Sequence, residues 1–239
     1  MSNSNLVSYT RISPNKNSPR NHAIDRISIH CVVGQCTAER IGEIFAPESR
    51  EASSNYGIGL DGRIGMYVEE KDRSWCTSSG ANDHRAVTIE VASDTAHPYA
   101  VKAAAFSALL DLCADICKRN GKKRLLWFGD KEKTLAYTPK ADEMVLTVHR
   151  WFANKACPGE YLYSRHGEIA AEDKPAGTGD NPSAWAKAAT EYCKRKGIFA
   201  GDGAGNFDWQ KPITREQVAA VLYRTLERAG LLEALPDKK

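Results

Sequence analysis

Residues 149–159 read HRWFANKACPG, and residues 27–30, far upstream, read ISIH. The first stretch places His149 at the end of an apolar run and Cys157 eight positions later, while the second ends in His30. Two imidazoles and one thiolate that leave a fourth position open are the ligands of a catalytic zinc site. Lys155 adds a cation two residues before the cysteine. The pattern therefore predicts a metal centre built from distant parts of the chain.

Apolar strands and helical stretches alternate around these residues through position 171. We expect strands near 27–32, 86–91, 122–128 and 144–149, and helices at 37–45, 97–120 and 158–171. Residues 1–25 are polar and predict an irregular arm. This order is typical of an α/β domain with a central mixed β-sheet flanked by helices.

A hairpin is expected between 56–60 and 63–69, because Asp61-Gly62 is a strong two-residue turn signal. Gly57 and Gly59 weaken the first of these strands unless another group approaches its backbone closely.

Side-chain alternation indicates how the metal centre could assemble. Along the first strand Ser28 and His30 face one way, and Glu90 and His149 hold matching places near the ends of two other strands. If these strands are neighbours, the three side chains converge, and the loop 150–156 can return Cys157 to the same place. A helix start and Lys155 would both favour the Cys157 thiolate.

Ordinary packing remains an alternative for each residue taken singly, since a strand-end histidine is commonly a satisfied polar residue. Cys31 is a competing ligand, although alternation points it away from His30.

Composition narrows the class of protein. The chain has 239 residues, enough for one medium domain and a small one, and its net charge of +3 is too weak to argue for nucleic acid. No run of 18 apolar residues predicts a membrane span. The first five residues, MSNSN, lack the pattern of a secretory signal, so we expect synthesis in a cytoplasm. The seven cysteines show no framework and are expected to be reduced thiols.

A second region begins after a linker. Residues 1–172 form the expected catalytic domain, 173–182 a Pro- and Gly-rich linker, and 183–239 a small helical unit. Residues 182–239 contain ten Lys/Arg and seven Asp/Glu, so the whole surplus of positive charge lies there. This hints at an anionic partner, although a solvated helix surface explains it equally well.

Residues 27–171 resemble the zinc-dependent N-acetylmuramoyl-L-alanine amidases, which include phage lysozyme-type enzymes and share the peptidoglycan-recognition-protein fold. The matching segments are ISIH at 27–30, SNYGI at 54–58, AVTIE at 86–90, VHR at 148–150 and NKACPG at 154–159. The resemblance implies Zn²⁺ held by His30, His149 and Cys157, with Tyr56, Glu90 and Lys155 as catalytic residues. The chain departs from the family after the first ligand, where it has CVVG at 31–34.

The function implied by the resemblance is that of an endolysin-like hydrolase made in the host cytoplasm, which acts on the cell wall by cleaving bacterial peptidoglycan. Trp75, Asn82 and Trp151 could line its substrate groove, because aromatic and amide groups suit sugar–peptide strands, or they could simply pack. A non-catalytic wall-recognition module and an intracellular amidase that recycles muropeptides are the alternatives.

The C-terminal region resembles one S-layer homology motif, with a glycine loop at 201–207 and a capping pattern from Thr214 to Gln217. The resemblance implies an anionic secondary cell-wall polymer as partner, bound by Arg215 with Asp202 and Gly203 beside it. One copy is small for independent stability. We therefore expect it to dock on the amidase domain or, preferably, to form a homo-oligomer through copies from other chains.

Overall fold

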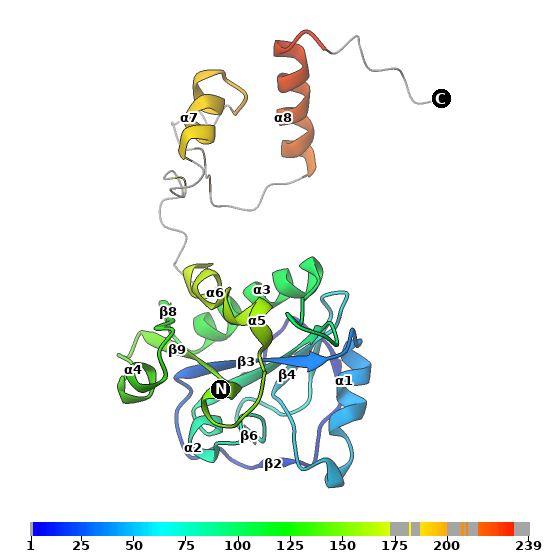
Figure 1. The fold of residues 1–239 in the computed structure, drawn as a ribbon, viewed down its shortest axis with the longest axis vertical. Coiled ribbons are helices and arrows are strands. Elements are labelled where there is room, and N and C mark those ends of the chain that lie inside the picture. The colour runs from blue at the N-terminus through cyan, green and yellow to red at the C-terminus, as the bar shows by residue number, and fades with distance from the viewer. Residues whose placement is uncertain are drawn as a thin grey trace. The chain divides into compact units, whose positions relative to one another are not determined.

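The computed structural model describes residues 2–172, 182, 187–199, 207, 209 and 215–231. The chain divides into two compact units, Met1–Pro175 and Ala176–Lys239 (Figure 1). In the second unit the described helices are α7 (Lys187–Arg195) and α8 (Arg215–Arg228). Apart from Pro182, the expected linker 173–182 lies outside the described residues.

A seven-stranded mixed sheet forms the centre of the first unit, with the order β1-β5-β4-β7-β3-β9-β8. Only β4 and β5 pair antiparallel within it; the other neighbours run parallel. Its strands are β1 (Val7–Thr10), β3 (Arg26–Val33), β4 (Tyr56–Ile58), β5 (Ile64–Met66), β7 (Ala86–Ser93), β8 (Arg124–Leu126) and β9 (Glu143–Val148). The expected mixed sheet flanked by helices is confirmed.

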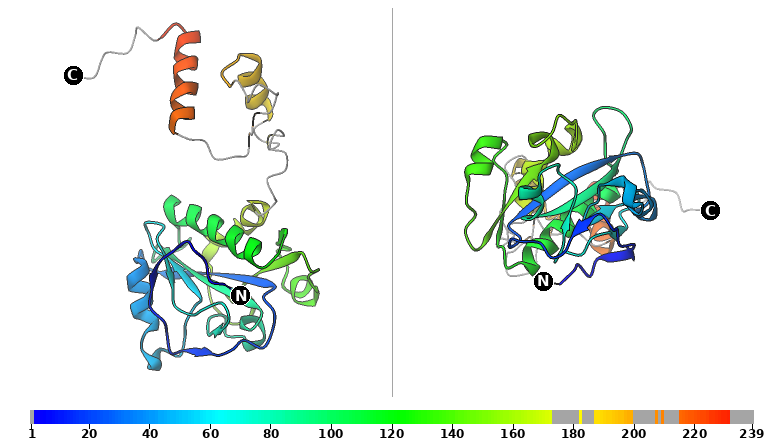
Figure 2. Two further views of the ribbon diagram at one scale, coloured as in Figure 1. Left: turned by 180° about the vertical axis from the view of Figure 1, so that it is seen from behind. Right: turned by 90° about the horizontal axis from the view of Figure 1, so that it is seen from below.

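Helices cover this sheet, and Figure 2 shows the long α3 running along it. The helices of this unit are α1 (Ala38–Phe45), α2 (Gly80–Asp83), α3 (Ala103–Arg119), α4 (Lys131–Ala136), α5 (Gly159–Tyr163) and α6 (His166–Glu172), with short 3₁₀ helices η1 (Glu48–Arg50) and η2 (His149–Trp151). A small second sheet pairs β2 (Lys16–Asn17) with β6 (Arg73–Ser74). Among the described residues, no helix has both the length and the apolar character that a membrane span requires.

The two faces of the sheet differ in chemistry. Ile27 and Ile29 of β3 pack with Leu109 and Leu112 of α3 in the main hydrophobic core, on one side of the strand. Ser28 and His30 alternate with them and so face the other side, where they are fully buried. Burying polar groups costs free energy unless they form hydrogen bonds. Polar residues kept on a buried face therefore point to a functional role.

Gly57 and Gly59 have the close neighbours that the sequence analysis required. A Cβ on Gly57 would lie 2.6 Å from Cε2 of Tyr67, and one on Gly59 would lie 2.8 Å from the backbone nitrogen of Ala38. The Tyr67 ring thus lies over β4, and its hydroxyl donates to the carbonyl of Ala38 at 2.6 Å. The glycines allow α1 to approach the strand.

Several expected element bounds were wrong. The arm of residues 1–25 contains β1, an edge strand defined by its pairing with β5 rather than by a strong local pattern. The long helix begins at Ala103 instead of 97, because the preceding loop closes through a hydrogen bond from the Asp94 amide to the Ala100 carbonyl at 2.8 Å. Residues 158–171 form two helices, α5 and α6, instead of one.

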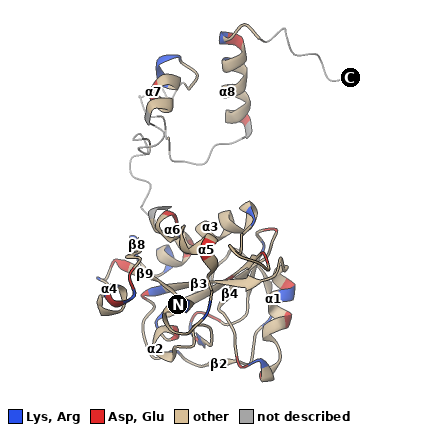
Figure 3. Ribbon diagram, in the orientation of Figure 1, with Lys and Arg blue, Asp and Glu red and all other residues tan. Residues whose placement is uncertain are grey.

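Charges of both signs occur on the same helices, as Figure 3 shows for α1 and α4. Helix α1 carries Glu39, Arg40 and Glu43, and α4 carries Lys131, Glu132 and Lys133.

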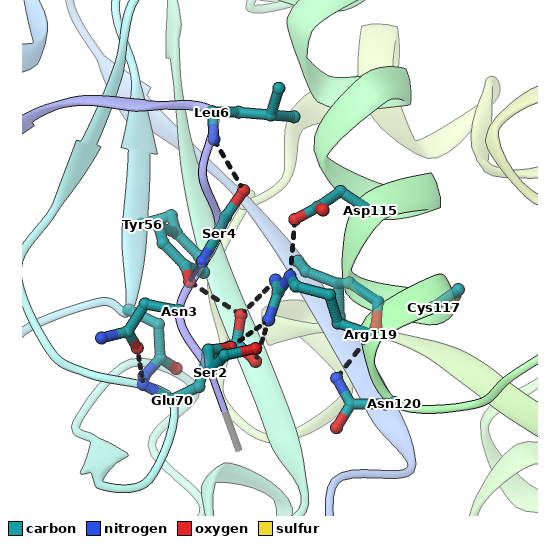
Figure 4. A network of polar contacts seen from close by, with 12 residues as sticks. Ser2, Asn3, Ser4, Leu6, Tyr56, Glu70, Asp115, Cys117, Arg119 and Asn120 are labelled. Carbon is teal, nitrogen blue, oxygen red and sulfur yellow. Dashed lines mark hydrogen bonds and ion pairs between the residues drawn. The ribbon is translucent and has the colours of Figure 1, made fainter.

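A buried ion pair ties the N-terminal segment to α3. Arg119 donates to both carboxylate oxygens of Glu70, at 2.6 and 3.0 Å, and to Asp115 at 2.8 Å (Figure 4). Glu70 is 1% exposed and also accepts a hydrogen bond from the Tyr56 hydroxyl at 2.7 Å. The Tyr56 oxygen in turn accepts from the Ser4 amide at 3.0 Å.

We predict that Arg119→Met lowers the free energy of unfolding by about 3–5 kcal/mol, because it leaves the Glu70 carboxylate buried without its cation. Adding Glu70→Gln should recover roughly half of that loss, since the uncompensated charge is then gone. Urea unfolding followed by circular dichroism measures both. Arg40→Met, which breaks the exposed pair of Arg40 with Glu43, is the control and should cause no measurable loss. Equal stability of the two single variants would contradict the prediction.

Candidate metal centre

Three side chains from separate parts of the chain meet at the polar face of the sheet. His30, His149 and Cys157 each offer one donor atom, and these atoms all lie within 4.8 Å of one another. Nδ1 of His30 lies 3.3 Å from Sγ of Cys157, and the two imidazole centroids are 5.1 Å apart. The convergence expected from strand alternation is therefore observed.

The loop after β9 brings Cys157 back to the sheet. His149 is the first residue of η2, directly after β9, rather than the last residue of the strand. The Arg150 amide donates to the Cys157 carbonyl at 3.1 Å, and the Arg150 guanidinium donates to the Ala156 carbonyl at 2.8 Å. These two bonds close the loop, so both ends of the HRWFANKAC segment lie beside His30.

Both imidazoles are held in the form that binds metal. Burial lowers the pKa of His30 well below its ordinary value, and the neighbouring His149 adds to the effect. Burial, followed by the charge of Lys155, also lowers the pKa of His149. Neutral imidazoles are the species that coordinate Zn²⁺. The Nε2 atom of His30 lies 3.3 Å from the Ser28 hydroxyl, which orients the ring.

In the protein alone, the stabilisation of the Cys157 thiolate that was expected from Lys155 and a helix start is outweighed by other effects. A hydrogen bond with Cys31 and burial raise the pKa of the Cys157 thiol well above its ordinary value. A dication bound between the thiol and the two neutral imidazoles would favour the thiolate. The donor set of two nitrogens and one sulfur thus fits zinc. Cys31 packs in the α3 core as alternation predicted, yet its thiol reaches Cys157.

Glu90 lies directly beside this centre. It is the register partner of His30, and its Oε1 is 4.0 Å from Nδ1 of that histidine. Its Oε2 is buried and has no hydrogen-bond partner in the described part of the protein. Burial raises the pKa of Glu90 to about 8. A carboxyl group with such a pKa can both accept and return a proton near neutral pH.

Lys155 is exposed, on the loop between η2 and α5. Because its charge influences His149, it lies within electrostatic reach of the centre.

Tyr56 is not at the centre, and the role expected for it is corrected. In the register of β4 with β7 it pairs with Ile89, so its ring lies in the core on the α3 side, opposite to Glu90. It is fully buried and bonded to Glu70. Burial and the Glu70 carboxylate raise the pKa of Tyr56, which keeps its hydroxyl protonated.

Two of the three residues expected in the groove are buried and packed against other side chains. Asn82 is 1% exposed and accepts a hydrogen bond from Arg26 at 3.0 Å. Trp151 stacks on Trp127 with ring centroids 5.2 Å apart and is largely buried. Trp75, in contrast, lines a cavity of about 350 Å³ that also includes Glu90 and His149 in its lining.

Three residues at the centre or in the cavity beside it were not expected from the sequence. Cys76 donates from its thiol to Oε1 of Glu90 at 3.9 Å, and with His30 and Glu90 it forms a second group of donors within 4.8 Å. Ser78 places its hydroxyl 3.1 Å from Nε2 of His149. Arg50 lines the same cavity. Cys76 could have been suspected because it follows Trp75; Ser78 and Arg50 carry no local signal.

Of the residues expected to bind a wall polymer, the structure describes only the backbone of Arg215. Asp202 and Gly203 lie outside the described residues, and Arg215 begins α8 with its side chain outside the described part.

Comparison with protein families matches residues 19–160 to the N-acetylmuramoyl-L-alanine amidase model and residues 180–219 to the S-layer homology domain. Comparison with curated protein sequences gives no match.

Among solved structures, AmpD, as a selenomethionine derivative, superposes with a TM-score of 0.50 and 17% identity over 71% of this chain and 99% of that one. The endolysin amidase LysCS of Clostridium intestinale superposes with a TM-score of 0.47 and 19% identity over 70% of this chain and 91% of that one. The Drosophila peptidoglycan recognition protein SA superposes with a TM-score of 0.45 and 16% identity over 64% of this chain and 81% of that one. At these identities the likeness concerns the fold alone. The family match covers more than half of the chain, which therefore belongs to the N-acetylmuramoyl-L-alanine amidases and carries a C-terminal S-layer homology domain.

Proposed function

We propose that this peptidoglycan amidase is a zinc-dependent, endolysin-like enzyme that hydrolyses the amide between N-acetylmuramic acid and L-alanine. The observation that carries the proposal is the meeting of the His30, His149 and Cys157 donors within 4.8 Å, beside a buried Glu90 with an unpartnered oxygen. Zinc bound by these donors would supply Lewis acidity, which lowers the pKa of a water molecule and polarises the scissile carbonyl.

Glu90 is the residue that moves the proton. It would accept a proton from the attacking water and give it to the nitrogen of L-alanine, which leaves as a free amine. Its raised pKa, caused first by burial, suits both halves of this exchange.

Lys155 stabilises the charge that forms on the substrate. Negative charge develops on the carbonyl oxygen when water adds to the amide, and a cation close to that oxygen lowers the barrier. Lys155 is exposed beside the centre, and its charge already acts on His149. Tyr56 has no part in this step, because it lies on the other side of the sheet.

The two alternative functions, a non-catalytic wall-recognition module and a muropeptide-recycling amidase, have less support. A wall-recognition module without catalysis needs neither a full set of metal donors nor a buried carboxylate beside them. A muropeptide-recycling enzyme needs no attachment to the wall, whereas this chain has an S-layer homology domain, which implies a cell-wall polymer as partner. We propose that this polymer is anionic and is bound through Arg215, Asp202 and Gly203, and that the enzyme acts on the wall itself.

Self-association through the second unit is also part of the proposal. Helices α7 and α8 present large apolar side chains to solvent, among them Tyr192, Leu222 and Tyr223 at 49, 58 and 55% exposure. Copies of the unit from other chains would bury these groups.

We predict that Cys157→Ser lowers zinc affinity by at least about 100-fold, because loss of a ligand should exceed the effect of losing an outer-shell contact. Metal analysis of purified protein measures the loss. Cys193→Ser, in the second unit, is the matched control and should keep its zinc. Full zinc occupancy in Cys157→Ser would contradict the proposed centre.

Digestion of peptidoglycan should release free L-alanine amino groups without new reducing sugar ends; reducing ends would identify a glycosidase and overturn the proposal.

Glu90→Gln should slow this release by about 10²–10⁴-fold. Lys155→Ala should slow it by about 10²–10³-fold. Both variants should retain zinc, and a zinc-free Lys155→Ala protein would assign that residue a structural role.

Removal of residues 176–239 should convert an oligomer into a monomer, because it deletes the exposed apolar faces of α7 and α8. Light scattering of the full-length and shortened chains measures the masses. A monomer mass for both chains would refute self-association.

A further inference from the structure

The cavity beside the metal centre has two contrasting parts. Its lining includes Glu90, Cys76 and His149 from the centre and an apolar wall from α1 made of Ile41, Ile44 and Phe45. Its volume of about 350 Å³ lies near the lower end of small-molecule sites, roughly 300–1,000 Å³. It can therefore hold a short segment of substrate.

The wall that carries Trp75 is preformed. The indole N–H donates to Oδ1 of Asn17 at 2.7 Å. The Ser53 amide donates to the Trp75 carbonyl at 2.9 Å, and the Trp75 amide donates to the Ser53 hydroxyl at 3.0 Å. Since Ser53 and Trp75 both line the cavity, these bonds fix its shape before substrate enters.

Arg50 supplies the positive charge in the cavity lining of the described protein. It ends η1, and the turn is closed by bonds from the Arg50 amide to the Pro47 carbonyl and from the Glu51 amide to the Glu48 carbonyl, both at 3.1 Å. Within the described residues, its guanidinium makes no hydrogen bond or short ion pair. Its charge nevertheless reaches Glu90, where it opposes the rise in pKa that burial causes.

The substrate has its free negative charge on one side of the scissile bond. The lactyl carboxyl of N-acetylmuramic acid is used up in the amide, so that side is neutral. The peptide on the nitrogen side ends in a carboxylate and contains an acidic residue after L-alanine. A guanidinium within reach of Glu90 is therefore complementary to the peptide and not to the sugar.

We propose that Arg50 binds a free carboxylate of the stem peptide and makes the enzyme select acidic over amidated stem peptides. The alanine methyl and the aliphatic part of the next residue would lie against Ile44 and Phe45, the α1 lining residues that are not fully buried. This assignment rests on the proposed function, because it places the leaving amine beside Glu90.

The test compares N-acetylmuramoyl-L-alanyl-D-glutamate with its diamide. We expect the natural enzyme to favour the free acid about tenfold through KM, and Arg50→Gln to remove the preference. Arg50→Lys should keep part of it, since a lysine holds the charge but not the bidentate geometry. Arg40→Gln, at an exposed position of α1 where Arg40 pairs with Glu43, loses the same charge and should keep the full preference. Equal use of both substrates by the natural enzyme, or an unchanged preference in Arg50→Gln, would overturn the proposal.

Binding measured by calorimetry in the Glu90→Gln background separates this inference from the proposed function. Tighter binding of the free acid than of the diamide, abolished by Arg50→Gln, supports the role of Arg50 even if the natural enzyme cleaves neither compound. In that case the proposed hydrolysis fails, and the proposed role of Arg50 stands. Binding of both compounds with equal affinity removes the role of Arg50 whatever the cleavage products are.

Discussion

The centre depends on the parallel pairing of β3 with β7, in which His30 is the register partner of Glu90. Because side chains alternate along a strand, a slip of one residue would turn Glu90 into the apolar core and bring Ile89 or Val91 to the metal side. The apolar neighbours of both residues resist such a slip, since Ile29 and Ile89 are fully buried against α3. Burial of one face thus fixes the chemistry of the other.

A buried polar face is stable only if its groups are paired, and most of this one is. The backbone amide of Asn55 donates to the Thr88 hydroxyl at 3.0 Å, and the backbone amide of Thr88 donates to the side-chain Oδ1 of Asn55 at 3.1 Å. Ser74 shares a further bond of 2.7 Å with the same hydroxyl. Against this background Oε2 of Glu90 and Oγ1 of Thr147 are exceptions, since both are buried without a hydrogen-bond partner among the described residues. The Glu90 oxygen lies beside the metal donors, where a bound metal and a water molecule would satisfy it.

Strand alternation made His30 and Glu90 predictable, because period-two patterns are local and both strands are clearly apolar on one side. Tyr56 was expected at the centre from the family resemblance and not from strand alternation. Its neighbour Gly57 has no side chain, so the alternation of β4 could not show which face Tyr56 takes; only pairing with Ile89 decides it. Cys76 lies in a loop and Arg50 ends the short helix η1, and both segments are positioned by long-range contacts, such as the pairing of Lys16 with Ser74 in the small sheet.

Gly57 links the register of the sheet to the shape of the cavity. It is the register partner of Glu90, and the Tyr67 ring and a methyl group of Ile41 lie where its side chain would be. A larger residue would therefore displace Tyr67, which holds α1 through the Ala38 carbonyl, and with α1 the wall formed by Ile41 and Phe45. The pairing that sets Glu90 beside the metal donors thus also sets the apolar wall beside Glu90, so the proposed catalytic residue and the proposed peptide site cannot shift independently.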